Sequence, residues 1–261
     1  MRAGTNEVVR SLAAAGPTAG LVGVFWARVS DVEPAPPALL DAAERARWAA
    51  YLRPVDRQRF LLGVLVTRLV IAELVGCRPE QLVLDRTCGS CGRPHGPVRL
   101  TDRSGWELSV THAGDWVGLA VAGDPVGIDI EPVDAAGDVE EVHADLLAPA
   151  ELRVLDSVAP GGRAVGLLRY WTRKEATLKA ARVGVTTPFT ELIVSAPDEP
   201  AAVVARPAGW EAWPPVRLAD LEGPPGHVAC MAILMTGRPR VDEADATSAL
   251  ALLLAGDPGI G

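Results

Sequence analysis

Two short segments of this chain carry acidic and basic side chains at spacings that restrict both their secondary structure and their chemistry. Asp129 and Glu131 are two residues apart in an apolar stretch, so on a β-strand both carboxylates point to the same face. Glu175 and Lys179 are four residues apart, so on a helix they lie one above the other. The sequence therefore predicts a strand and a helix that each present charged groups on one face.

Taken singly, each pattern is typical of a solvated surface. A Glu–Lys pair at this spacing contributes only about 0.2–0.5 kcal/mol to a helix, and an Asp-x-Glu pair often marks an exposed strand end. The setting favours a functional site, because Asp129 interrupts the apolar strand 126–130 and an unpaired buried carboxylate is costly. Magnesium binds oxygen ligands and commonly combines carboxylates with substrate phosphate oxygens. We therefore predict a magnesium–diphosphate site.

Read together, the two segments resemble the paired signature of the Sfp-type 4′-phosphopantetheinyl transferases. That signature is Gly-x-Asp followed, after a gap, by Trp/Phe-Ser/Thr/Cys-x-Lys-Glu-Ala/Ser-x-x-Lys. The chain has Gly127-Ile128-Asp129 and then Trp171-Thr-Arg-Lys-Glu-Ala-Thr-Leu-Lys179, so every fixed position matches. A two-part match of this length is hard to obtain by chance.

The resemblance continues outside the signature. Segment 108–117 is similar to the family's Ser/Thr-His-Ser/Ala-Gly strand, 59–68 to its first long helix, and 88–96 to a cysteine-bearing loop of many actinobacterial members. In all, residues 21–236 can be laid along the family. The resemblance implies an α+β fold: a pseudo-twofold pair of similar α/β lobes, each a small, mainly antiparallel sheet packed with a long helix. It places the active site in the cleft between the lobes.

Periodicity and turn residues along the chain predict its organisation. We expect a flexible N-terminus (1–20), an N-terminal lobe (21–123), a C-terminal lobe with the magnesium site (124–237) and a C-terminal tail (238–261). Helices are predicted at 38–52, at 57–75, from about 149, at 164–181 and at 243–255. Strands are predicted at 21–29, 108–111, 116–122, 126–131, 191–195, 216–218 and 227–235. The proline-rich stretch 197–215 is expected to be irregular.

The resemblance implies an enzyme that moves the 4′-phosphopantetheine arm of coenzyme A to a serine of an apo carrier protein (acyl, peptidyl or polyketide) and releases 3′,5′-bisphosphoadenosine. It implies Mg²⁺ bound by Asp129, Glu131 and Glu175, with Lys179 along the diphosphate and His112 on a phosphate. Metal and lysine would stabilise charge on the transferring and leaving oxygens. The expected catalytic residues are Glu175, Lys179 and His112.

The attacking serine must lose its proton, and a carboxylate near the metal is the natural base. Glu175 is the first choice and Glu151 the second, and the pattern does not separate a ligand role of Glu175 from a base role. Trp171 is expected to pack beside the site. His112 taken alone is more typical of a core histidine satisfied by backbone at a strand end, and the family context favours the phosphate contact instead.

Further contacts to coenzyme A are expected from basic side chains. Arg47, in an arginine-rich stretch, falls closest to the family's residues that reach the 3′-phosphate. Where many members have Gly-Lys-Pro this chain has Gly-Pro-Val at 96–98, so Arg93 or Arg99 would have to substitute. Lys174 lies on a different helix face from Lys179 and is equally typical of a lysine that faces solvent or the carrier. The predicted coenzyme A-binding residues are Arg47, Arg59, Arg93, Thr111, His112, Lys174 and Lys179.

The four cysteines raise a separate question. Cys88 and Cys91, with His95 and Cys77, have a composition that could form a tetrahedral zinc site. A second tight ligand pair is missing, however, and a glycine-rich turn with two small thiols explains the pattern equally well. We predict no stoichiometric zinc.

Composition restricts the partners and the location. A net charge of −8 argues against nonspecific nucleic-acid binding. No uninterrupted apolar run is long enough for a membrane helix, and the first residues do not read as a signal peptide, so we expect a cytoplasmic protein. A monomer is expected, because two lobes suffice to form the site. The resemblance and the composition also suggest a role in polyketide or nonribosomal peptide biosynthesis.

Two other functions remain open from the sequence. A magnesium-dependent diphosphate or nucleotide hydrolase could use the same carboxylates with water as the nucleophile. A non-catalytic binding module could be built around the cysteine loop, and it would keep its function after Asp129→Ala.

Overall fold

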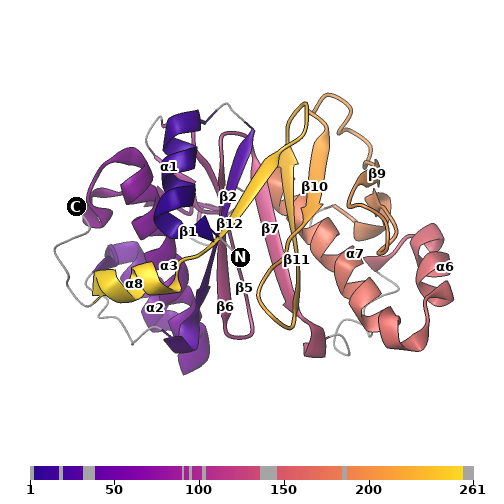
Figure 1. The fold of residues 1–261 in the computed structure, drawn as a ribbon, viewed down its shortest axis with the longest axis horizontal. Helices are drawn as coiled ribbons and strands as arrows, with labels where there is room; N and C mark the ends of the chain where they lie inside the picture. The colour runs from indigo at the N-terminus through magenta and orange to yellow at the C-terminus, as the bar shows by residue number, and fades with distance from the viewer. Residues whose placement is uncertain are drawn as a thin grey trace. The chain divides into compact units, whose positions relative to one another are not determined.

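The computed structural model describes residues 3–17, 20–31, 39–89, 91–93, 96–101, 104–135, 146–183 and 187–254. The chain divides into two compact units, the first made of Met1–Gly123 and Arg240–Gly261 and the second of Asp124–Pro239. Each unit packs a long helix of 22 residues on a small sheet (Figure 1). These helices are α3 (Pro54–Val75) and α7 (Pro160–Ala181).

The first unit is built around a five-stranded sheet in the order β1-β12-β2-β6-β5. Its strands are β1 (Ala3–Gly4), β2 (Leu21–Arg28), β5 (Glu107–Ala113), β6 (Trp116–Ala122) and β12 (Arg240–Asp245). Strands β2, β6 and β5 run antiparallel, whereas β12 runs parallel to β2. The predicted strands at 21–29, 108–111 and 116–122 are confirmed. A separate ribbon pairs β3 (Leu84–Asp85) with β4 (Arg99–Leu100).

Helix α3 forms the centre of the first unit's core. Proline at its first position fits a helix start, and Gly76 ends it in the left-handed conformation, with φ 70°, as a glycine cap does. The shorter helix α2 (Ala42–Ala50) starts with a capping box between Asp41 and Glu44. Both predicted helices are therefore confirmed, with shifted ends.

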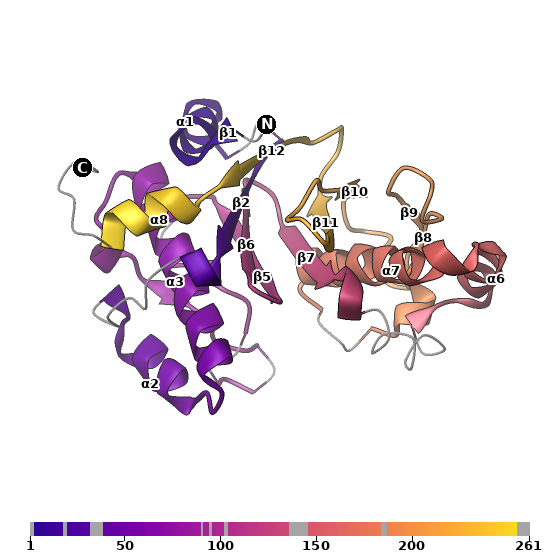
Figure 2. The ribbon, with the colours of Figure 1, turned by 60° about the horizontal axis from the view of Figure 1, so that its bottom comes forward.

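The first residues of the chain differ from the expected flexible N-terminus. Helix α1 (Thr5–Ala15) buries Val8, Val9 and Leu12, and it packs on β2 and α3 (Figure 2). These three apolar residues lie on one helix face, so burial rather than helix propensity holds the segment in place.

The end of the described chain also returns to the first unit. The predicted helix at 243–255 is divided between strand β12 and the helix α8 (Thr247–Leu254). Strand β12 pairs with β2 over Arg240–Asp245, and α8 contacts both α3 and β2.

The second unit is a three-stranded sheet covered on one face by α7 (Figure 1). Its antiparallel strands, in the order β10-β11-β7, are β10 (Val216–Asp220), β11 (His227–Leu234) and β7 (Val126–Pro132). The remaining elements are helix α6 (Pro149–Ser157) and the hairpin of β8 (Ile193–Val194) with β9 (Val203–Ala205). The predicted strands and helices of this region are confirmed, and β9 lies in the stretch expected to be irregular.

Gly127 allows β7 to approach α7 closely. A Cβ atom on Gly127 would lie 2.0 Å from the carbonyl oxygen of Ala176 and 2.5 Å from the backbone nitrogen of Ala180. No side chain fits at such distances, so glycine is required for this strand-to-helix contact. The contact places the end of β7 directly beside the charged face of α7.

The α+β class with small, mainly antiparallel sheets and long helices is confirmed. The pseudo-twofold relationship and the cleft between lobes stay predictions. No helix within the described ranges combines the length and the apolar character needed to cross a membrane.

Candidate functional site

Strand β7 and helix α7 bring four of the predicted residues together, which we call the carboxylate site: Asp129, Glu131, Glu175 and Lys179. Asp129 is only 5% exposed. Its Oδ1 accepts a hydrogen bond from Nζ of Lys179 at 2.6 Å, and the same ammonium donates to the carbonyl of Ile128 at 3.1 Å. The aspartate of the strand and the lysine of the helix are thus joined by an ion pair.

The three carboxylates of the carboxylate site repel one another. Burial, and then the negative charges of Asp129 and Glu175, raise the pKa of Glu131 to about 7, although Lys179 opposes the rise. Burial also raises the pKa of Glu175, and Asp129 adds to that effect. One lysine therefore does not neutralise three acids, and an additional cation would stabilise their ionised forms.

The donor set fits a hard divalent cation such as magnesium, because all three acids offer oxygen ligands. In the present geometry Lys179 occupies one oxygen of Asp129. Within the described ranges, no three His, Cys, Asp or Glu side chains are grouped closely enough to hold a metal ion. Metal binding would therefore require the lysine and the glutamates to rearrange.

Trp171 positions Glu131 in the carboxylate site. A hydrogen bond from the Trp171 side chain acts on the Glu131 carboxylate and opposes the rise of its pKa. The indole is itself held by stacking on Phe189, with ring centroids 5.6 Å apart and an angle of 19° between the planes. The expectation that Trp171 packs beside the site fits this arrangement.

Lys174 differs from the predicted coenzyme A contact, because it is fully buried. Its Nζ lies 2.5 Å from Oε2 of Glu151 and donates to the carbonyls of Leu146 and Phe189, both at 2.9 Å. These three acceptors use all three ammonium protons. Lys174 therefore connects α7 to neighbouring segments and has no proton left for a phosphate.

Glu151, the second choice for the base, is committed to the same buried pair. Besides Lys174, its carboxylate accepts hydrogen bonds from the backbone N–H groups of Ala148 at 2.8 Å and Val194 at 2.9 Å. It is 3% exposed. These contacts make Glu151 a buried helix cap whose carboxylate oxygens are both engaged.

The first unit contains a second charged feature, a cavity of about 140 Å³ that we call the arginine cavity. The guanidinium of Arg47 lies over the ring of Phe60, 5.2 Å from its centroid. Nε of Arg86 is buried without a hydrogen-bond partner. Burial, and then the charge of Arg47, lower the pKa of Arg86 to about 10. The cavity is lined by Asp41, Ala43, Glu44, Arg47, Phe60, Leu84, Asp85, Arg86 and Thr87.

The acids that line the arginine cavity, Asp41, Glu44 and Asp85, each have other hydrogen-bond partners. Oε2 of Glu44 is bound to Arg68 at 2.7 Å and to the backbone N–H of Asp41 at 2.9 Å, so this oxygen is committed elsewhere. An anion with several oxygens would satisfy Arg86 and reduce its repulsion with Arg47. Sequence reasoning missed Arg86, because a single arginine after a short strand belongs to no motif.

Other predicted residues of the first unit lie around the β5–β6 turn. Nε of Arg59 donates to the carbonyl of Gly114 at 2.6 Å. His112 is exposed on β5, next to buried Thr111, and the charges of Arg59 and His112 both act on Asp56. Arg59 and His112 thus belong to one basic region, whereas Thr111 is buried.

Arg93 makes a different contact from the one expected. It is exposed and hydrogen-bonds to Cys91, and it does not line the arginine cavity. His95 of the suggested zinc site lies outside the described residues.

Acids that repel one another beside a lysine are typical of enzymes that handle phosphate groups with a divalent cation. Comparison with known families makes this class specific. The model of the 4′-phosphopantetheinyl transferase superfamily matches residues 125–216, and a model of the N-terminal part of a 4′-phosphopantetheinyl transferase matches residues 34–124. The chain belongs to the 4′-phosphopantetheinyl transferase superfamily.

Individual relatives agree with this membership. The 4′-phosphopantetheinyl transferase HetI of Nostoc is 30% identical over 172 residues, which cover 66% of this chain and 71% of that protein. The protein slr0495 of Synechocystis is 34% identical over 164 residues, which span 62% of this chain and 63% of the relative's length. A solved holo-(acyl-carrier-protein) synthase of Bacillus anthracis in complex with coenzyme A has 16% identity and a TM-score of 0.37, over 43% of this chain and 96% of that one.

Proposed function

We propose that this protein transfers the 4′-phosphopantetheine arm of coenzyme A to a serine of an apo carrier protein. The observation that carries the proposal is the carboxylate site, where the signature residues Asp129, Glu175 and Lys179 lie on the adjoining β7 and α7, with Asp129 paired to Lys179 and Glu131 close enough to act on their charges. The reaction is proposed to depend on Mg²⁺ and to release 3′,5′-bisphosphoadenosine.

The metal would be held by Asp129, Glu131 and Glu175, and when bound it would supply charge stabilisation to the diphosphate oxygens. Lys179 would exchange its bond to Asp129 for one to the diphosphate, because the metal would take over the neutralisation of that carboxylate. Trp171 keeps Glu131 oriented toward the site through its hydrogen bond.

Glu175 is the proposed base for the serine hydroxyl of the carrier. Burial raises the pKa of its carboxylate, and a carboxylate with a raised pKa holds a transferred proton better. The competing candidate, Glu151, has its oxygens engaged by Lys174 and two backbone N–H groups. Among the described residues, no comparable set of hydrogen bonds engages the Glu175 carboxylate.

In the first unit, we propose that the arginine cavity receives the 3′-phosphate of coenzyme A. Arg47 was the expected contact, and Arg86 adds a second guanidinium with an unpartnered Nε. Arg59 and His112 are proposed to contact another phosphate of coenzyme A. Phosphate oxygens are well matched to guanidinium donors, which bind them through paired hydrogen bonds.

The carrier is proposed to be an acyl, peptidyl or polyketide carrier of secondary metabolism, and the protein to act as a cytoplasmic monomer. These finer statements rest on the resemblance to the family and on the composition. The choice of apo carriers in the activity assay tests the proposed carrier class.

The test is incubation of the protein with coenzyme A, Mg²⁺ and a panel of apo carriers, followed by intact mass measurement. A carrier that gains the mass of phosphopantetheine supports the proposal, and Asp129→Asn should abolish the gain. Asp198→Asn, which changes an exposed carboxylate of the same unit, is the matched control and should keep it. Coenzyme A cleavage without a modified carrier would instead identify a hydrolase, and no modification of any carrier would contradict the transferase.

A further inference from the structure

Cys88, Cys91, Gly92 and Arg93 belong to a closed turn that we call the cysteine turn. The backbone N–H of Cys88 donates to the carbonyl of Arg93, and the N–H of Gly92 donates to the carbonyl of Cys88, both at 2.8 Å. Gly92 has φ 70°, a conformation that favours glycine. These bonds tie Cys88 to the two residues that follow Cys91, so both cysteines are held in one turn.

The two thiols of the cysteine turn interact directly. A side-chain hydrogen bond joins Cys91 and Cys88, and Cys91 also accepts hydrogen bonds from the side chain and the backbone of Arg93. Together, with the Arg93 contacts first, these bonds lower the pKa of Cys91 below that of an ordinary thiol. Cys91 is exposed and Cys88 half-buried. An accessible thiol of lowered pKa next to a second thiol is the arrangement found in redox-active pairs.

The backbone next to the turn restricts it further. Gly96 packs so tightly against Thr87 and Cys88 that a Cβ would lie 2.8 Å from the Thr87 carbonyl oxygen. The N–H of Gly96 also donates to the carbonyl of Arg86 at 2.7 Å. The pair is therefore preorganised, which favours closure of a short disulfide over reaction with a distant thiol.

We propose that Cys88 and Cys91 are a reversible modification site, a dithiol that hydroperoxides oxidise to an intramolecular disulfide. The proposal is independent of the transferase activity. Cys91 is the residue that reacts with the oxidant, and Cys88 is the residue that closes the disulfide.

The chemistry balances in two steps. The Cys91 thiolate attacks one peroxide oxygen, the O–O bond breaks, and the leaving hydroxide takes up a proton to become water. Cys91 is then a sulfenic acid. The sulfur of Cys88 attacks the sulfur of Cys91, the S–O bond breaks, and the oxygen leaves as a second water with the proton of Cys88. Two thiols lose two electrons in all, and an added thiol reverses the reaction by exchange.

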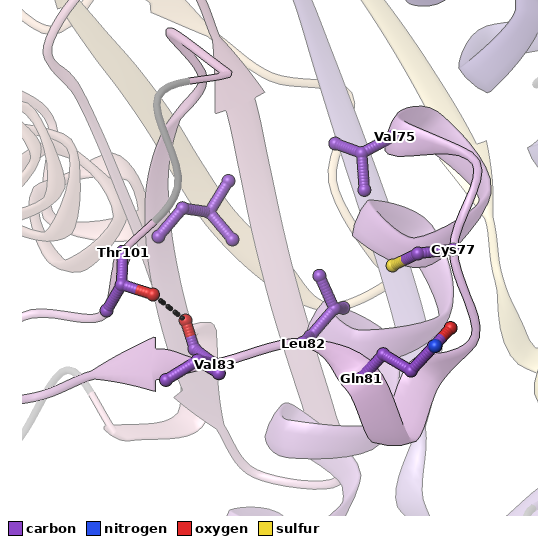
Figure 3. A pocket seen from close by; sticks show the side chains of 7 residues that line it. Val75, Cys77, Gln81, Leu82, Val83 and Thr101 are labelled. Atoms are coloured by element: carbon purple, nitrogen blue, oxygen red, sulfur yellow. Dashed lines mark hydrogen bonds between the residues drawn. The ribbon is translucent and has the colours of Figure 1, made fainter.

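The other two cysteines provide internal controls. Cys230 is fully buried, and burial raises the pKa of its thiol. Cys77 lines a separate cavity of about 420 Å³ with Val75, Leu82 and Val83 (Figure 3). Neither thiol shares the closed turn, so both should react slowly with peroxide.

The test exposes the full chain to hydrogen peroxide and measures its intact mass without reductant. We expect rapid loss of the mass of two hydrogen atoms, restored by dithiothreitol, and unchanged in the double variant Cys77→Ser with Cys230→Ser. In Cys88→Ser, Cys91 should gain the mass of one oxygen and react with dimedone, whereas Cys91→Ser should react slowly.

Three results would overturn the proposal. One is that the wild-type chain keeps its mass under these conditions. Another is a peptide map that connects Cys88 or Cys91 to Cys77. The third is elemental analysis that finds one zinc per chain, lost in Cys88→Ser and Cys91→Ser, because the thiols would then be metal ligands.

Discussion

Nζ of Lys179 lies 2.6 Å from Oδ1 of Asp129, so in the proposed reaction an incoming diphosphate would compete with a buried carboxylate for this lysine. The ion pair holds the lysine beside the strand. In the proposed reaction, a metal on Asp129 would compete with Lys179 for the same oxygen. Substrate and metal are thus expected to bind together rather than independently.

Asp129→Asn should lower the rate of carrier modification by at least about 100-fold, since removal of one group that stabilises developing charge commonly costs that much. The amide oxygen can still accept the hydrogen bond from Lys179, so the fold should persist. Initial rates from intact mass measurement and a thermal melt check both points. A variant that keeps more than a tenth of the wild-type rate would argue against a role of Asp129 in metal binding.

Metal-free protein should become less stable as the pH rises toward 7. The pKa of Glu131 in the folded state is about 7, above its ordinary value of 4.5, so between these values the folded chain binds a proton that the unfolded chain has released. Stability therefore falls with increasing pH across this window. In Glu131→Gln the fall should be smaller.

This pH effect is measured as Tm between pH 5 and pH 8 in the presence of a chelator. The wild-type Tm should decline relative to that of Glu131→Gln, and Mg²⁺ with coenzyme A should reduce the difference. Parallel curves for the two proteins across the window would show that Glu131 is not perturbed.

Lys174→Met should reduce the free energy of unfolding by about 3–5 kcal/mol, because it leaves the Glu151 carboxylate buried without its partner. Urea denaturation measures the change. Arg163→Met removes an exposed ion pair with Asp156 at the start of the same helix and should cost no more than about 1 kcal/mol. If Lys174→Met instead kept its stability and raised KM for coenzyme A, the lysine would be a substrate contact.

Gly127→Ala should destabilise the second unit by about 1–3 kcal/mol, the usual cost of overpacking, because its Cβ would collide with the backbone of α7. Gly161→Ala is the matched control. It lies in α7 where a Cβ meets nothing within 4 Å, so it should be neutral or stabilise by up to about 1 kcal/mol. Equal effects of the two substitutions on urea midpoints would contradict the close approach of β7 to the helix.

Arg86→Met should have two opposite effects if the arginine cavity binds the 3′-phosphate. The variant should melt at a higher temperature without ligand, because a buried, poorly paired charge is removed. Its KM for coenzyme A should rise about 10-fold or more, the loss expected for hydrogen bonds to a charged group, with little change for dephospho-coenzyme A. A similar rise for both substrates would place the 3′-phosphate elsewhere.

Helices and strands whose side chains follow a single helical or strand periodicity were predicted well from the sequence. The apolar run that becomes α3, the alternation in β5 and β6, and the two-residue spacing of Asp129 and Glu131 each depend on neighbours in sequence. The long-range partners could not be predicted in this way. Lys174 looks like a solvated residue in its helix, and its partner Glu151 is 23 residues away. Arg173 is likewise fully buried, and its ion-pair partner Asp220 is 47 residues away.

Segment α1 shows a related limit of the sequence. Its helix is short, and Pro17 follows it closely, so its local signal is weak. Burial of Val8 and Leu12 against β2 and α3 is what stabilises it, and that surface exists only in the folded unit. The unpartnered Nε of Arg86 is equally invisible without the packing that surrounds it.

Strand β12 lies between β1 and β2 in the sheet of the first unit, although it follows the entire second unit along the chain. On the ribosome, the second unit is continuous and can complete its sheet as soon as it emerges. The first unit starts earlier but must wait for β12, and until then one edge of β2 is exposed for pairing with other chains. The part synthesised first is therefore completed last, and its open sheet edge is exposed for the longest time.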